Sequence, residues 1–190
     1  SEIILSCISN EHPELKKIAL LAADDMYGQT FVDWFAFQAV ELNLEPVCIE
    51  TYKKSGELEG CLERIIDSGA DAVVCVPSAA EDVVPVQNYI DDFIYNSESW
   101  RYIALMFADK AYNKSILSGE HPVDFISGLA PASHPGSGFD VSYDALYGRV
   151  PYAGEAQVYD AVLITVLASI WAEKNDEEDL NKAIAALLNG

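Results

Sequence analysis

The stretch IALLAADDMYGQT (residues 18–30) joins an apolar strand to a polar turn and the start of a helix. All six residues from 18 to 23 are apolar, which is typical of a central strand of a parallel sheet, because helices cover both faces of such a sheet. Asp24, Asp25, Tyr27 and Gly28 follow within five positions. Ligands of doubly wound sheets bind beyond the carboxyl ends of the strands. The stretch therefore predicts a parallel α/β fold and one part of a binding site.

Apolar runs alternate with helical periodicity over most of the chain. Strands are expected at 18–23, 46–51, 71–76, 101–107 and 123–129, and helices at about 28–43, 57–68, 82–95 and 110–118. This alternation predicts an α/β fold with a doubly wound parallel sheet of about five strands. Right-handed crossovers give the expected strand order 2-1-3-4-5.

The segment PSAAEDVVPV (77–86) contains two competing helix starts. Ser78 and Glu81 have the spacing of a capping box, whereas Pro85 is tolerated only in a first helical turn. Both cannot hold for one straight helix. We expect the helix to begin near Asp82, with 78–80 as a loop at the edge of the sheet.

The pattern changes after residue 130. The segment APASHPGSG (130–138) is rich in Pro, Gly and Ser and is typical of a connector. Only helices are expected beyond it, at about 139–147, 154–174 and 177–188. We therefore predict an α/β lobe over 12–130 and an all-helical segment over 131–190.

The charge of the chain restricts the class of ligand. Eleven Lys and Arg residues against thirty-one Asp and Glu residues give a formal net charge of −20. Nucleic acids and anionic membranes would be repelled, so a cationic or zwitterionic small molecule fits this field better. With 51% hydrophobic residues in 190, the chain can bury a core without metal or disulfides.

Cysteine spacing and apolar segments give weaker indications. The four cysteines lie on expected helices and strands without C-x-x-C spacing, which favours free thiols over a disulfide or metal site and leaves the redox compartment open. The N-terminal residues lack the pattern of a signal peptide, although such a segment could have been removed. The apolar run 161–172 is short for a membrane span, and we expect a core or interface helix there.

Three segments together resemble a known family. They are KKIALLAADDMYGQTFVDWF (16–35), GADAVVCVPSAAED (69–82) and GRVPYAGEAQVYDAVLITVLASI (148–170). Their order and spacing resemble the type 1 periplasmic binding proteins, in particular the receptors for branched-chain amino acids. The resemblance covers residues 12 to about 175. It implies a bilobal protein nearly twice this length, with this chain corresponding to the second lobe and part of the first.

The resemblance also implies a ligand held between the two lobes. Tyr27 matches the tyrosine that lies against the bound amino acid in the family, and Asp109 matches the acid that meets the α-ammonium of the ligand. With the other residues at the same strand ends, the candidate ligand-binding residues are Asp24, Asp25, Tyr27, Gly28, Ser78, Ala79, Ala80, Phe107 and Asp109. The free N–H groups of the first helical turn, at about 28–30, could also bind a negative group.

Each of these residues has an ordinary structural alternative. Asp24, Asp25 and Asp109 could be acids that favour a helix N-terminus, and Tyr27 could serve packing alone. The residues 78–80 are small where the branched-chain receptors carry a bulkier aromatic contact, which leaves the identity of the ligand open.

The resemblance implies a non-enzymatic, extracytoplasmic solute-binding receptor without a cofactor, working with an ABC permease. A periplasmic or extracellular location follows, and lipid anchoring of the full-length protein is left open. The alternative is a ligand-sensing domain of a signalling receptor or regulator with the same fold. A response-regulator receiver needs a phosphate-accepting Asp at the end of its third strand, and this chain has none at that position. No P-loop or G-x-S-x-G turn is present either. The three histidines lie scattered beside prolines, which argues against a metal cluster.

The last expectation concerns 152–172, a segment that is apolar around most of a helical circumference. A helix of this kind must be buried on several sides. We expect it to be covered by the other lobe, by its own sheet, or by self-association with another copy of the chain.

Overall fold

The structure is a computed structural model that describes residues 1–96, 101–112, 116, 127–134, 136–152 and 154–189. It divides into two compact units, unit 1 at Ser1–Ala130 and unit 2 at Pro131–Gly190. Unit 1 contains the helix α1 (Glu2–Glu11), so this unit includes residues ahead of the predicted lobe start at residue 12.

A parallel sheet forms the centre of unit 1. Its strands are β1 (Lys17–Ala23), β2 (Glu45–Tyr52), β3 (Ala72–Val76) and β4 (Ala104–Phe107), in the order β2-β1-β3-β4. The predicted order is therefore confirmed for four strands. The predicted fifth strand, 123–129, lies mostly outside the described residues. Its described end forms a parallel bridge from Gly128 to Phe107, on the far side of β4.

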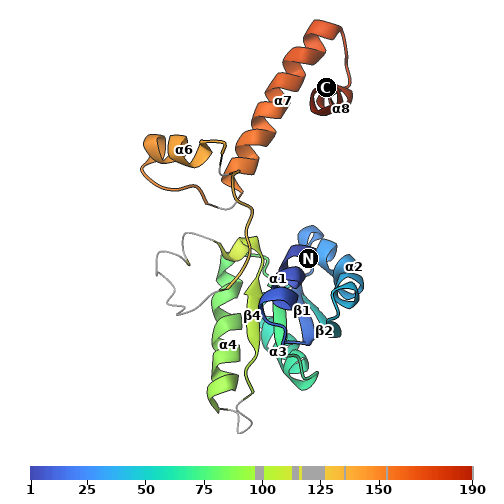
Figure 1. Cartoon of the computed structure of the whole chain (residues 1–190), viewed down its shortest axis with the longest axis vertical. Helices are drawn as coiled ribbons and strands as arrows, with labels where there is room; N and C mark the ends of the chain where they lie inside the picture. The colour runs from blue at the N-terminus through green and yellow to red at the C-terminus, as the bar shows by residue number, and fades with distance from the viewer. Residues whose placement is uncertain (97–100, 113–115, 117–126, 135, 153, 190) are drawn as a thin grey trace. The chain divides into compact units, whose positions relative to one another are not determined.

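Two layers of helices cover the sheet (Figure 1). The helices α3 (Leu58–Asp67) and α4 (Val83–Asn96) pack on one face, and α1 and α2 (Met26–Glu41) pack on the other. Six of the seven β1 residues are buried, as expected for a central strand. Gly69, with φ of 78°, ends the turn after α3 in the left-handed conformation that favours glycine.

The starts of β4 and α4 depend on neighbouring residues. β4 begins at Ala104 and not at residue 101, because its pairing partner β3 begins at Ala72 and the two residues are in register. α4 follows a short 3₁₀ turn at Ala80–Asp82, and Pro85 lies in its first turn, as predicted. The predicted helix 110–118 lies largely outside the described residues, beyond a 3₁₀ turn at Asp109–Ala111.

Unit 2 is helical, as predicted. It contains α6 (Phe139–Tyr147), α7 (Glu155–Asn175) and α8 (Leu180–Asn189), and α8 packs along α7. α8 begins three residues later than predicted because Asp179 accepts a hydrogen bond from the Asn181 N–H and caps the helix.

α7 is apolar on faces that unit 2 leaves open. Only Ala156 and Ala168 of this helix are buried, and its exposed large apolar residues are Val158, Tyr159, Val162, Leu163, Val166, Leu167 and Ile170. Although the apolar run alone is short, the whole helix of 21 residues is long and apolar enough to cross a membrane, a property shared by core helices of soluble proteins. The four cysteines are free thiols, two of them buried.

Candidate functional site

The carboxyl ends of the four parallel strands lie at one edge of the sheet, and the predicted residues follow these ends. Several hydrogen bonds join the loops there, and three of them connect different strand ends directly. Tyr27 bonds to Asp109, the Asp24 N–H donates to the Tyr52 carbonyl at 2.7 Å, and the Ser78 N–H donates to the Tyr52 hydroxyl at 3.0 Å. We call this group of loops the strand-end site.

Tyr27 and Asp109 form the central contact of the strand-end site. The Tyr27 hydroxyl donates to Oδ1 of Asp109 at 2.6 Å, across 82 residues of sequence. Burial, and then the bond to Asp109, raise the pKa of the Tyr27 phenol well above its ordinary value. The phenol therefore remains a neutral donor, and it leaves the negative charge of Asp109 uncompensated.

Asp25 is occupied by its own helix and by a lysine. Its Oδ1 accepts the Gly28 N–H at 2.7 Å and caps α2, and its Oδ2 lies 3.2 Å from Nζ of Lys110. The bond from the Gly28 N–H, followed by the one from Lys110, lowers the pKa of Asp25. Asp25 thus acts as the helix-capping acid that was the structural alternative to a ligand contact.

Lys110 was not among the predicted residues. Its ammonium bonds to Asp25 and lies 5.1 Å from the centre of the Tyr27 ring, within reach of a cation–π interaction. It contributes a positive group to the strand-end site, paired with Asp25. No sequence pattern indicates that Lys110 would bond to Asp25, because the two residues lie 85 positions apart.

Gly28 brings α2 against the end of β1. A Cβ atom at this position would lie 1.9 Å from the carbonyl oxygen of Ala23, so a larger residue would force the helix away. The Gly28 and Gln29 N–H groups are not free for a ligand, contrary to expectation. The Gly28 N–H bonds to the Asp25 side chain, and the Gln29 N–H bonds to the Asp25 carbonyl.

A buried network, absent from the predictions, fixes the loop after β3. The Tyr52 hydroxyl donates to Oδ2 of Asp82 at 2.8 Å, and the Ser55 hydroxyl donates to Oδ1 at 2.6 Å. Asp82 is only 4% exposed, and burial raises the pKa of Tyr52. Because Tyr52 also accepts the Ser78 N–H, the end of β2 holds the loop 78–80 in place.

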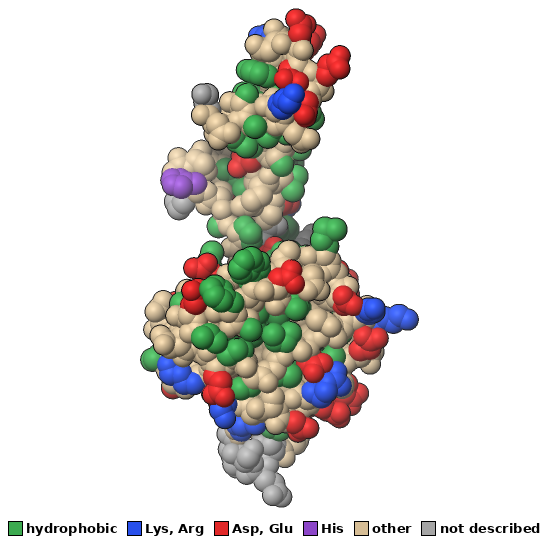
Figure 2. All heavy atoms as spheres, turned by 90° about the vertical axis from the view of Figure 1, so that its right-hand side faces the viewer, with side chains coloured by type: hydrophobic (Ala, Val, Ile, Leu, Met, Phe, Trp, Pro, Cys, Tyr) green, Lys and Arg blue, Asp and Glu red, His purple; other side chains and the backbone are tan. Residues whose placement is uncertain are grey.

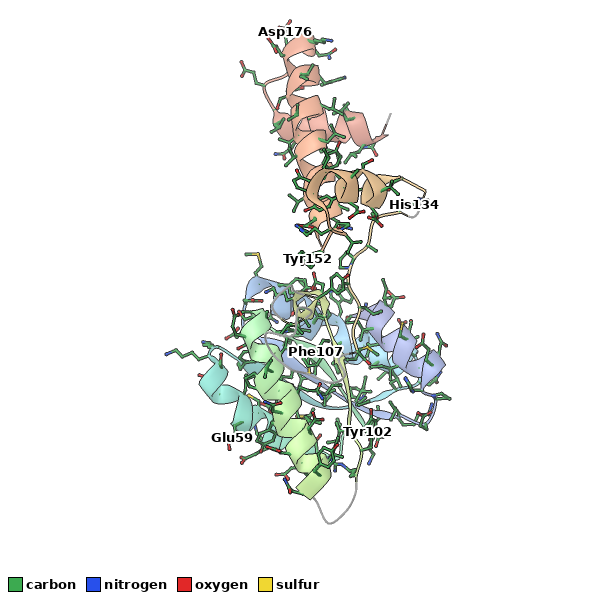
Figure 3. The ribbon with its side chains drawn as sticks, turned by 90° about the vertical axis from the view of Figure 1, so that its left-hand side faces the viewer. Glu59, Tyr102, Phe107, His134, Tyr152 and Asp176 are labelled. Atoms are coloured by element: carbon green, nitrogen blue, oxygen red, sulfur yellow. The ribbon has the colours of Figure 1, made fainter. Side chains whose placement is uncertain are left out.

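The remaining predicted site residues differ in how far their side chains are exposed to solvent. Ser78 and Ala79 are exposed, whereas Ala80 is 7% exposed and packs in the core. Phe107 is fully buried in the same core, at the end of β4 (Figure 3). Its side chain therefore has no exposed surface for a ligand, and this correction reflects its place in the core cluster that also contains residues of α3 and α4.

The charges of the strand-end site do not balance. Asp24 pairs with Lys53 at 3.4 Å and Asp25 with Lys110 at 3.2 Å, whereas Asp109 has the neutral Tyr27 as its partner. Among the described residues, Asp109 is thus the one of these three carboxylates that takes part in no ion pair. A ligand with one ammonium group would complete this arrangement.

Within the part of the chain that the structure describes, no group of three or more potential ligands could hold a metal ion. Two of the three histidines have local partners. His12 contacts Glu14 at 3.4 Å, and Nδ1 of His134 accepts the Gly136 N–H. His121 lies outside the described residues.

Solved structures match the chain over almost its entire length. A leucine-binding protein from Thermotoga maritima matches 97% of the chain at 14% identity, with a TM-score of 0.66 and 52% of that protein covered. The chain has the fold of the type 1 periplasmic binding proteins. A periplasmic ligand-binding protein of a branched-chain amino acid ABC transporter from Burkholderia xenovorans matches 97% at 14% identity, with a TM-score of 0.64 and 49% covered.

A third match is a solute-binding protein of an ABC transporter from R. palustris, solved with benzoate. It matches 96% of the chain at 17% identity, with a TM-score of 0.68 and 49% of that protein covered. The chain thus spans about half the length of these periplasmic-binding-protein structures. Comparisons with protein-family models and with curated proteins find no match.

Proposed function

We propose that this chain supplies the ligand-binding lobe of an extracytoplasmic solute-binding receptor of an ABC transporter. The fold supports this class of protein, and the matching solved structures include proteins of such transporters. A second lobe closes over the strand-end site in this proposal, and an ABC permease accepts the released ligand. The protein binds its ligand without chemical conversion.

The proposed ligand is a small amino-acid-like molecule with an ammonium group. The observation that carries this proposal is the uncompensated carboxylate of Asp109 beside the neutral phenol of Tyr27. A purely anionic ligand, such as the benzoate bound by one structural relative, would meet this carboxylate unfavourably. In the proposed complex, Asp109 accepts from the ammonium and Tyr27 packs against the ligand, while the exposed Ser78 and Ala79 border the side-chain pocket.

Substitution of Asp109 tests the proposal. In the full-length protein, Asp109→Asn should weaken the binding of amine-bearing ligands by about 1.5–3 kcal/mol, the scale of a hydrogen bond to a charged group. Neutral and anionic ligands should bind almost as before. Calorimetric titration with a panel of amino acids and their deaminated analogues measures both effects.

Glu63→Gln provides the control, because Glu63 is an exposed carboxylate on α3, outside the strand-end site. This change should alter affinity little. Equal affinity for an amino acid before and after Asp109→Asn would remove Asp109 from the site. A sensing role remains the alternative, and a signalling domain in the full-length protein would favour it over transport.

A further inference from the structure

Four large apolar side chains are exposed on one side of unit 1. Trp34, Phe37 and Val40 of α2 have exposed fractions of 58, 58 and 63%, and their spacing of three places them on neighbouring positions of the helix surface. Ile49 of the edge strand β2 is 39% exposed and pairs with Leu20, whose side chain lies on the sheet face that α2 covers. We call Trp34, Phe37, Val40 and Ile49 the α2 patch.

The α2 patch is distinct from the strand-end site. Its helical members lie on the middle and last turns of α2, whereas Tyr27 and Gly28 lie on the first. The rings of Trp34 and Phe37 contact each other edge to face, with centroids 6.5 Å apart. Figure 2 faces this side of unit 1 and shows hydrophobic side chains gathered on it. Single exposed apolar residues are common, but a group of this kind marks an interaction surface.

Carboxylates are the charged groups of the two helices on this side, α1 and α2. Asp33 and Glu41 are exposed and lie four residues before and after Phe37 on α2, and Glu2 is exposed on the adjacent α1. α1 and α2 together contain no Lys, Arg or His. Within the described residues, these three carboxylates take part in no ion pair. The helical part of the α2 patch is thus accompanied by negative charge, whereas Lys and Arg side chains lie elsewhere on this face of unit 1 (Figure 2).

We propose that the α2 patch is a docking site for a partner protein whose apolar contact surface is bordered by Lys and Arg. The apolar centre supplies buried area, and the basic border pairs with Asp33 and Glu41. A second copy of the chain is a poor occupant, because a two-fold contact through this face would bring the same carboxylates together. The net charge of −20 likewise opposes an anionic bilayer or a nucleic acid.

A pair of synthetic amphipathic helical peptides provides the probe. Both carry the same face of Leu and Trp, and Lys flanks this face in one peptide and Glu in the other. Fluorescence anisotropy of the labelled peptides is measured against the whole chain, at concentrations where the chain is monomeric. The Lys peptide should bind, with an affinity that falls as salt is added, and the Glu peptide should not.

Variants of the chain locate the binding. Trp34→Ser combined with Phe37→Ser should weaken the Lys peptide by about tenfold or more, because central aromatic residues dominate most interfaces. Asp33→Asn combined with Glu41→Gln keeps the apolar residues and should flatten the salt dependence. Tyr95→Ser is the matched control, since Tyr95 is a large side chain on α4 that is 80% exposed and lies outside the patch.

Several outcomes would overturn the proposal. They are equal binding of the two peptides, or binding of the Lys peptide that the Trp34 and Phe37 changes leave intact. A dimer in sedimentation analysis that the same double variant dissociates would assign the face to a second copy instead. Binding to vesicles of anionic lipid that this variant abolishes would assign it to a membrane.

Discussion

At the level of single residues, Gly28 determines how closely α2 approaches β1. A Cβ atom here would lie 1.9 Å from the Ala23 carbonyl oxygen, which belongs to the backbone and cannot rotate away. Gly28→Ala should therefore lower the free energy of unfolding by about 1–3 kcal/mol, the usual cost of overpacking. This cost exceeds the gain of roughly 0.5–1 kcal/mol that Ala brings within a helix. Urea unfolding of the whole chain measures the difference.

Gly56 offers the matched control for this change. It lies in the 3₁₀ turn Ser55–Glu57, and a Cβ atom there would contact nothing within 4 Å. Gly56→Ala should leave the unfolding midpoint almost unchanged. If the two variants proved equally stable, the close approach of α2 to β1 would not be the reason for a glycine at position 28.

The sequence indicated some of the strand-end site because its residues follow strand ends. Tyr27 and Asp109 were predicted from their positions and from the family resemblance, and the structure joins them directly. Lys110 was missed, as was the buried pair of Tyr52 and Asp82, because their partners are far away in sequence. Local patterns report which strand end a residue follows, but not which side chain faces it from another loop.

At the level of helices and strands, the predicted alternation was confirmed for the first four strands and the three helices between them, because the central strands are apolar at nearly every position. The boundaries that moved depend on tertiary partners. β4 could begin pairing only where β3 begins, at Ala72 opposite Ala104. The start of α8 depends on the Asp179 side chain, which bonds to the Asn181 N–H, although an acid at that position is equally compatible with a longer helix.

The start of α7 depends on the ionisation of Glu155. Arg149 bonds to both carboxylate oxygens, at 2.9 and 2.6 Å, and the Tyr152 N–H donates to one of them at 2.6 Å. These bonds, the arginine first, lower the pKa of Glu155 from 4.5 to about 2. An acid whose pKa is lowered by folding stabilises the folded state at pH values above its ordinary pKa. The contribution is lost as the pH falls through the folded value.

We therefore expect the helix content of the chain to fall between about pH 4.5 and pH 2 in part because Glu155 becomes protonated. Circular dichroism across this range measures the loss, and Glu155→Gln should remove that part of the pH dependence. Glu173→Gln is the control, because Glu173 is an exposed acid near the other end of the same helix. Identical pH profiles for the original chain and Glu155→Gln would contradict this role of the carboxylate.

For the molecule as a whole, the main unfavourable feature is the apolar surface that α7 exposes to water. The three periplasmic-binding-protein structures described above are about twice as long as this chain, which covers 49–52% of them. A bilobal receptor would bury such a helix against the rest of its other lobe, which supports a core role for α7 over a membrane span. The chain of 190 residues has no such lobe among its described residues.

The final prediction is that the 190-residue chain self-associates through α7. Val158, Val162, Val166 and Ile170 form a stripe at spacings of four residues, with exposed fractions of 64, 59, 50 and 46%. At about 25 cal/mol per Å², covering roughly 200 Å² of apolar surface stabilises an assembly by about 5 kcal/mol. Val162→Lys combined with Val166→Lys should therefore raise the concentration at which light scattering first detects oligomers, whereas Glu173→Lys, which adds charge outside the stripe, should matter less. A stable monomer at high concentration with an unaltered α7 would show that this stripe is not a contact surface.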